Sequence, residues 1–132
     1  MIGYKSIWFA ATCCLALTAP VTLGDTPCQP DPRRDPIKVK FDDAGKPEVT
    51  PDAVNACEGE EIRWIFQGTQ AREFAVIFRS AVDSPFDWSE QRGATVTGTI
   101  KAGAAKNRAT TEYKYDVAVG DQRLDPRIIV DP

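Results

Sequence analysis

EYKYDVAV, residues 112–119, alternates large apolar side chains with polar or small ones. In an extended chain, one face of this segment carries Tyr113, Tyr115, Val117 and Val119. Successive side chains of a β-strand point to opposite faces, so this period of two predicts a strand with one buried face and one solvated face. The segment therefore predicts β structure near the end of the chain.

Six further segments of the 132-residue chain have β character and are separated by turn residues. They are residues 37–41, 49–56, 62–66, 74–78, 95–100 and 127–130. About seven short strands, with turns roughly every 8–12 residues, are typical of an antiparallel β-sandwich. We therefore predict an all-β fold, a Greek-key sandwich without an amphipathic helix of convincing length.

The first 24 residues have the organisation of a secretory signal peptide. Lys5 is the only charge ahead of the apolar residues 7–17, and small residues follow them. We predict cleavage after Gly24, which assigns the mature protein to the periplasm or the extracellular space. The apolar stretch is about half of the roughly 20 residues that span a bilayer, so we expect no membrane span after cleavage. An uncleaved anchor and lipidation at Cys13 are the alternatives.

Two cysteines, Cys28 and Cys57, remain after removal of this leader. In an oxidising compartment they predict a single structural disulfide. By the loop-entropy model such a bridge contributes roughly 3–4 kcal/mol to the free energy of unfolding. Two free thiols or a redox pair are the alternatives, but a redox pair usually has Cys-x-x-Cys spacing.

Residues 25–36, DTPCQPDPRRDP, contain four prolines and predict an extended arm. The β-sandwich domain is predicted to occupy residues 37–132, and the disulfide would hold the arm across it. The arm's Arg33 and Arg34 are interpreted as a solvated charge pair beside two aspartates, with a ligand clamp as the alternative.

The order of these signals resembles that of the cupredoxin-like family. Residues 58–66, EGEEIRWIF, look like the family's strand with glycine, an acidic residue and tryptophan, and residues 73–78, EFAVIF, resemble the next strand. Residues 112–117 and 128–130 are similar to the family's last two strands. The resemblance covers most of residues 37–130 and implies the family's sandwich. Greek-key sandwiches of immunoglobulin type share such short motifs and remain an alternative.

The ligands for copper do not accompany this resemblance. Electron-carrying members hold copper with two imidazoles and a thiolate in one plane, usually with a weak axial thioether. The sequence contains no histidine, and its sole methionine is Met1. Residues 116–126, where the family's ligand loop would fall, contain no soft ligand. We therefore predict a member without metal or cofactor, which carries no electrons.

Charge excludes a further class of function. The formal net charge is −3, and no run of lysine and arginine stands out. The electrostatic footprint of a protein that binds a phosphate backbone is therefore missing, and we expect no nucleic-acid partner. The absence of histidine also removes the commonest general base.

The loop of residues 80–94 contains the best candidates for a contact surface, Phe86 and Trp88. Aromatic side chains anchor many interfaces, which motivates this hypothesis. The alternative is that both rings plug the open end of the sandwich. Tyr113 and Tyr115 are predicted to lie in the core.

Two groups of carboxylates support weaker alternatives. The first comprises Asp42, Asp43 and Glu48, and the second comprises Glu58, Glu60 and Glu61. The first group offers oxygen ligands for calcium, although aspartates followed by glycine are typical of a turn. The second offers a general acid and a base for glycoside hydrolysis.

These observations favour an exported interaction module of the cell envelope over an enzyme. Its partner would be an envelope protein or a small ligand, and no catalytic residue is assigned. A small carboxylate-based hydrolase and a weak oxygen-ligand metal carrier are the alternatives. The sequence does not predict an oligomeric state.

Overall fold

The computed structural model describes Gly3 and residues 27–132. The predicted leader, with Cys13 and the cleavage point after Gly24, lies outside the described residues apart from Gly3. In the part of the chain that is described, no helix has the length and apolar character needed to cross a membrane.

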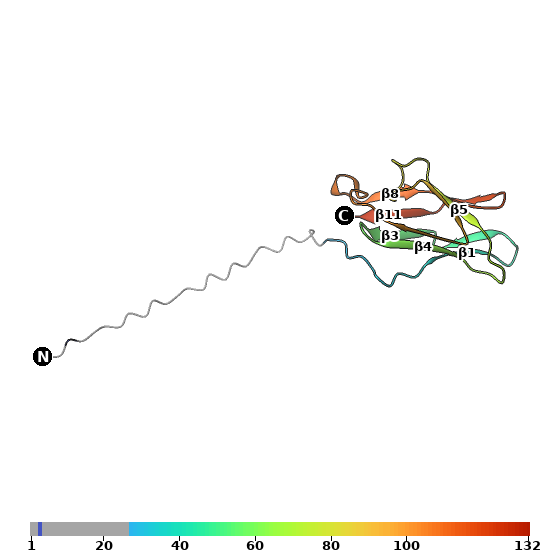
Figure 1. Ribbon diagram of the computed structural model, residues 1–132, viewed down its shortest axis with the longest axis horizontal. Coiled ribbons are helices and arrows are strands. Elements are labelled where there is room, and N and C mark those ends of the chain that lie inside the picture. The colour runs from blue at the N-terminus through green and yellow to red at the C-terminus, as the bar shows by residue number, and fades with distance from the viewer. Residues whose placement is uncertain (1–2, 4–26) are drawn as a thin grey trace.

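Eleven strands and one short 3-10 turn make up the described domain. The strands are β1 Ile37–Phe41, β2 Pro47–Thr50, β3 Ala53–Cys57, β4 Glu61–Phe66, β5 Phe74–Ile77, β6 Glu90–Gly93, β7 Thr95–Thr99, β8 Thr111–Lys114, β9 Asp116–Val119, β10 Gln122–Leu124 and β11 Arg127–Asp131. The 3-10 turn is Lys106–Arg108. The all-β prediction is confirmed (Figure 1).

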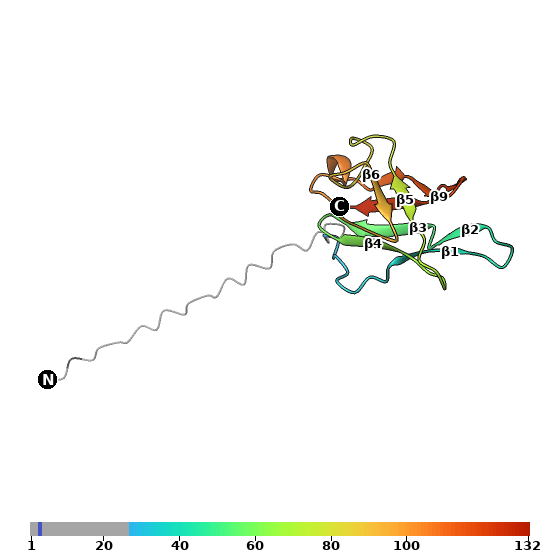
Figure 2. The same cartoon turned by 45° about the vertical axis from the view of Figure 1, so that its right-hand side comes forward.

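Three hydrogen-bonded sheets build the sandwich, with strand orders β2-β1-β4-β7, β10-β9-β5-β6 and β3-β11-β8. Figure 2 shows β5, β6 and β9 on one side of the molecule and β1, β2 and β4 on the other. The pairing is antiparallel except for β1 with β4 and β3 with β11, which run parallel. The fold is therefore a mixed sandwich, whereas the sequence predicted an antiparallel one.

The strands are shorter and more numerous than predicted. Residues 112–119, predicted as one strand, form β8 and β9, because β8 pairs with β11 and β9 pairs with β5. Residues 49–56 divide in the same way between β2, which pairs with β1, and β3, which pairs with β11. β6 and β10 fall where the sequence predicted loop and turn. Both are sheet-edge strands, stabilised by one neighbour each.

Alternation along the strands places their apolar faces in one core. Tyr113, Tyr115, Val117 and Val119 are all buried, as the period of two predicts. The largest fully buried side chains include Trp64, Phe74, Phe86, Ile37, Ile62, Ile100 and Ile128. Burial of this apolar surface is the main favourable contribution to folding.

Candidate functional site

An aromatic cluster closes the middle of the sandwich. Trp64 meets Phe86, Trp88 and Tyr115 edge-on, with ring centroids 5.7, 6.3 and 5.7 Å apart. The indole N–H of Trp64 donates a hydrogen bond of 3.0 Å to the hydroxyl of Tyr115. The cluster therefore satisfies its buried polar groups internally, as a stable core requires.

Phe86 and Trp88, the predicted contact residues, both belong to this cluster. Their rings stack at 4.8 Å, over the position of Gly98, where an added Cβ would approach Phe86 to 2.7 Å. Phe86 has no exposed surface, so a partner at the molecular surface does not reach it. Trp88 is only partly buried, and its role in binding stays a prediction.

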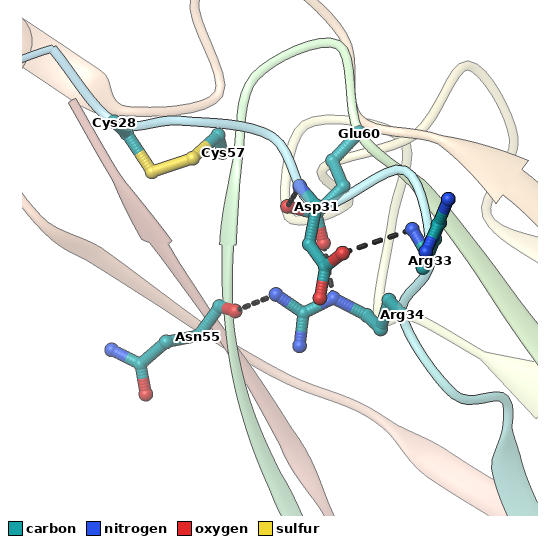
Figure 3. A network of polar contacts seen from close by, with 7 residues as sticks. All are labelled: Cys28, Asp31, Arg33, Arg34, Asn55, Cys57 and Glu60. Atoms are coloured by element: carbon teal, nitrogen blue, oxygen red, sulfur yellow. Dashed lines mark hydrogen bonds and ion pairs between the residues drawn. A yellow bond between two sulfur atoms is a disulfide. The ribbon is translucent and has the colours of Figure 1, made fainter.

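The Pro-rich arm is fastened to the domain at two places (Figure 3). Cys28 is joined to Cys57 by a disulfide, as predicted, with their Cα atoms 5.5 Å apart. The backbone N–H of Cys28 also donates to the carbonyl of Pro132 at 3.1 Å. The beginning of the arm is therefore linked to β3 and to the end of the chain.

The second fastening is a buried carboxylate. Glu60, only 2% exposed, accepts hydrogen bonds from the guanidinium of Arg34 and from the backbone N–H of Asp31. Arg34 also donates to the carbonyl of Asn55. Arg34 therefore neutralises a charge that would be costly to bury alone. The interpretation of Arg34 as a solvated charge is wrong, whereas Arg33 is exposed.

Other predicted carboxylates have structural partners as well. Glu58 accepts the backbone N–H groups of Gly103 and Ala105, each at 3.0 Å. Asp42 accepts those of Ala44 and Lys46 at 2.9 Å and so forms the turn between β1 and β2. Over residues 27–132, no group of three or more cysteine, aspartate or glutamate side chains is arranged to hold a metal ion.

A hollow of about 760 Å³ lies beside β8. It exists because β5 and β9 remain paired only as far as Ile77 and Asp116. Residues 79–83 then leave the sheet as an exposed turn. Continuation of the same register would have placed residue 79 opposite Lys114. Instead, β8 has β11 on one side and the hollow on the other.

The backbone of β8 presents hydrogen-bonding groups to this hollow. The N–H of Tyr115 donates to the carbonyl of Pro126, on the β11 side. Backbone groups alternate in direction along a strand, so those of Glu112 and Lys114 point away from β11. Outside the strand ladders, no backbone group of residues 27–132 forms a hydrogen bond with either residue. This edge is therefore open.

Two tyrosines form the inner side of the hollow. Tyr113 and Tyr115 line it but are almost completely buried, and the hydroxyl of Tyr113 donates to the carbonyl of Ala104 at 2.6 Å. Burial raises the pKa of Tyr113, with the carboxylates of Glu58 and Asp83 adding to the effect. Burial also raises the pKa of Tyr115, against a smaller lowering by the hydrogen bond from Trp64. Both phenols therefore stay neutral at neutral pH and cannot act as bases there.

Charged side chains line the outer part of the hollow. Arg123 pairs with Asp116 at 3.0 Å, and Glu112 pairs with Arg127 of β11 at 3.5 Å. Lys114 forms no ion pair with any residue between 27 and 132. The edge of β8 thus presents an acidic and a basic side chain on either side of Tyr113.

Sequence reasoning found β8 but missed its open edge. The alternation in Glu112-Tyr113-Lys114 predicted a strand with one polar face. The pairing of this strand with β11 is needed to show which of its two edges has no neighbouring strand in the described chain. The link from Arg34 to Glu60 was missed for the same reason, because the two residues are 26 positions apart.

Comparisons with known proteins find similarity only among solved structures. No family model matches the chain, and no curated protein sequence matches it. A proline-to-glycine variant of amicyanin, in its reduced Cu(I) form at pH 4, is similar with a TM-score of 0.45 and 13% identity, over 74% of this chain and 84% of that one. An oxidised proline-to-glycine variant has a TM-score of 0.45 and 14% identity, over 80% and 90%. A methionine-to-alanine variant of amicyanin with Cu(I) has a TM-score of 0.43 and 13% identity, over 83% of this chain and 97% of that one. Amicyanin is a cupredoxin, the family that the sequence resembles.

Proposed function

We propose that this chain is an exported interaction module of the cell envelope, which holds its ligand in the hollow beside β8. The observation that carries the proposal is the open backbone edge of β8, set in a hollow of about 760 Å³. Unpaired strand edges are ready templates for another chain, and proteins normally pair, cover or protect them. The leader-like sequence of residues 1–24 supports export.

The side chains around the hollow favour binding over catalysis. Asp116 and Glu112 are ion-paired, and Asp83 accepts a hydrogen bond from Ser80. The two tyrosines keep their protons at neutral pH because burial raises their pKa values. The chain contains no histidine, the commonest general base, and the hollow offers hydrogen-bonding groups and charges to a ligand.

Site-specific photo-cross-linking in the native cell tests this proposal. A photoreactive phenylalanine analogue replaces Lys114 in the full chain, and a matched variant carries it at Thr97, an exposed position on β7. We expect one adduct of defined mass from position 114 and none from position 97. Equal labelling at both positions would contradict a ligand site at β8, and no adduct at either position would contradict an envelope partner for that site.

A further inference from the structure

We infer that the ligand is an extended polypeptide segment that adds to β8 as an antiparallel strand and carries the pattern Glu-x-Lys. This inference rests on the proposed function and names its ligand class. A strand supplies what the edge lacks, because its own N–H and C=O groups match those of Glu112 and Lys114. β8 contains four residues, so it can pair with a segment about 13 Å long.

Backbone geometry restricts the register of the added strand. In the central part of β8, only Glu112 and Lys114 direct both their N–H and their C=O groups to the hollow. In an antiparallel pair, each of them therefore faces a ligand residue whose N–H and C=O groups point toward β8. Two ligand residues separated by one position satisfy this condition. The ligand residue between them then lies opposite Tyr113, in a non-hydrogen-bonded pair.

Charge favours one identity at each flanking position. Lys114 forms no ion pair with any residue between 27 and 132, and the ion pair of Glu112 with Arg127 is half exposed and 3.5 Å long, so a ligand lysine can share this carboxylate. Directly opposed side chains of opposite charge stabilise a strand pair, and like charges destabilise it. In an antiparallel ligand, the residue opposite Lys114 comes before the residue opposite Glu112. The ligand therefore reads acidic, any residue, basic, and Glu-x-Lys is its simplest form.

The middle residue is expected to be apolar. Side chains alternate across a sheet, so it points to the same side as Tyr113, whose ring is buried. Ile77 and Phe78 give the hollow an apolar lining in addition to the two tyrosines. Valine satisfies the condition and has a high strand propensity.

A second copy of this chain is a less suitable occupant, although its own β8 reads Glu-Tyr-Lys. Arg79, Asp83 and Lys106 line the hollow, so a second folded copy would meet these side chains before its own β8 reached this edge. A single extended segment has no such loops. The observations thus favour a flexible or terminal segment of another protein.

Two peptides of equal composition test the inference on the full mature domain. The probe is acetyl-TTEVKTT-amide, and the control is acetyl-TTKVETT-amide, in which the charges are exchanged. Binding is followed by the amide NMR shifts of Glu112 and Lys114 during titration. Because two cross-strand pairs change from attraction to repulsion, we expect the probe to bind about tenfold more tightly than the control.

A charge-exchanged protein completes the test. The double variant Glu112→Lys, Lys114→Glu should reverse the preference between the two peptides, and Lys114→Ala should reduce it. Both positions are exposed, so the variants should keep the native circular dichroism spectrum. The preference should also weaken in high salt.

Three results would overturn the inference. They are equal affinity for the two peptides, shifts that fall outside β8, and a protein dimer that Lys114→Glu dissociates. If the cross-link at position 114 forms but neither peptide binds, the proposed function stands and the strand-addition model fails. If no cross-link forms while the peptide preference is observed, the envelope partner is the part that fails.

Discussion

Two hollows on this molecule are lined by charged side chains, but they differ in how those charges are paired. The hollow at the arm, about 620 Å³, is lined by residues of the chain's own N-terminal arm together with Glu60. There a buried carboxylate meets Arg34 and a backbone N–H. The hollow beside β8 has a similar mixture of charges, but no strand of the described chain covers the edge.

The comparison shows what can remain open in a folded protein. A buried carboxylate loses its hydration and requires partners within the chain, so the arm and the domain are interdependent. The backbone groups and charges at β8 lie at the surface, where water satisfies them until a ligand arrives. The first region therefore contributes to stability, and the second is available for binding.

The largest expected effect concerns the covered region. The double substitution Cys28→Ala, Cys57→Ala removes the disulfide without leaving a free thiol. Because the bridge closes a loop of 29 residues, we expect a loss of about 3–4 kcal/mol in the free energy of unfolding. Urea unfolding at pH 7 measures it. A loss below about 1 kcal/mol would show that the arm is held mainly by its other contacts.

Glu60→Gln should have the next largest effect. It keeps the shape of the side chain but removes the charge that Arg34 neutralises, so we expect a loss of about 1–3 kcal/mol. The matched control is Glu61→Gln, at an exposed neighbouring position, where the change should stay within about 0.5 kcal/mol. Equal losses for the two variants would mean that burial of Glu60 has no special importance.

The smallest effect concerns the tyrosines beneath the open hollow. Burial raises the pKa of Tyr115, so the folded protein holds this proton more tightly than the unfolded chain does. The resulting stabilisation is complete below about pH 10, and it should be lost by up to about 1.4 kcal/mol per pH unit above that value.

Urea unfolding between pH 9 and pH 11 measures this slope, and the absorbance of tyrosinate reports ionisation directly. Tyr115→Phe should make the slope shallower. If Tyr115 ionised near pH 10 while the domain stayed folded, water would reach this side chain. The contrast between the buried inner side of the hollow and the exposed edge of β8 would then be wrong.

Local patterns were sufficient for much of the fold. The period of two in residues 112–119 predicted which side chains are buried, and the predicted leader, which leaves Cys28 and Cys57 as the remaining cysteines, predicted their bridge. Binding residues were harder to predict. Phe86 was predicted as a contact residue, but its ring is buried in the core, where it occupies the space that a side chain at position 98 would need. No local sequence pattern distinguishes an aromatic residue that packs in the core from one that binds a partner at the surface.

By itself, the sequence determined the β character of the chain, its apolar faces and the lack of imidazole ligands for copper, because these depend on residue identity and on spacing along one strand. Only the tertiary structure decided that Arg34 neutralises Glu60 and that β8 has one free side. Both depend on which distant segments become neighbours. Residues 79–83 leave the sheet, a feature seen only in the fold, so no strand of the described chain lies beside Glu112 and Lys114 on the side opposite β11.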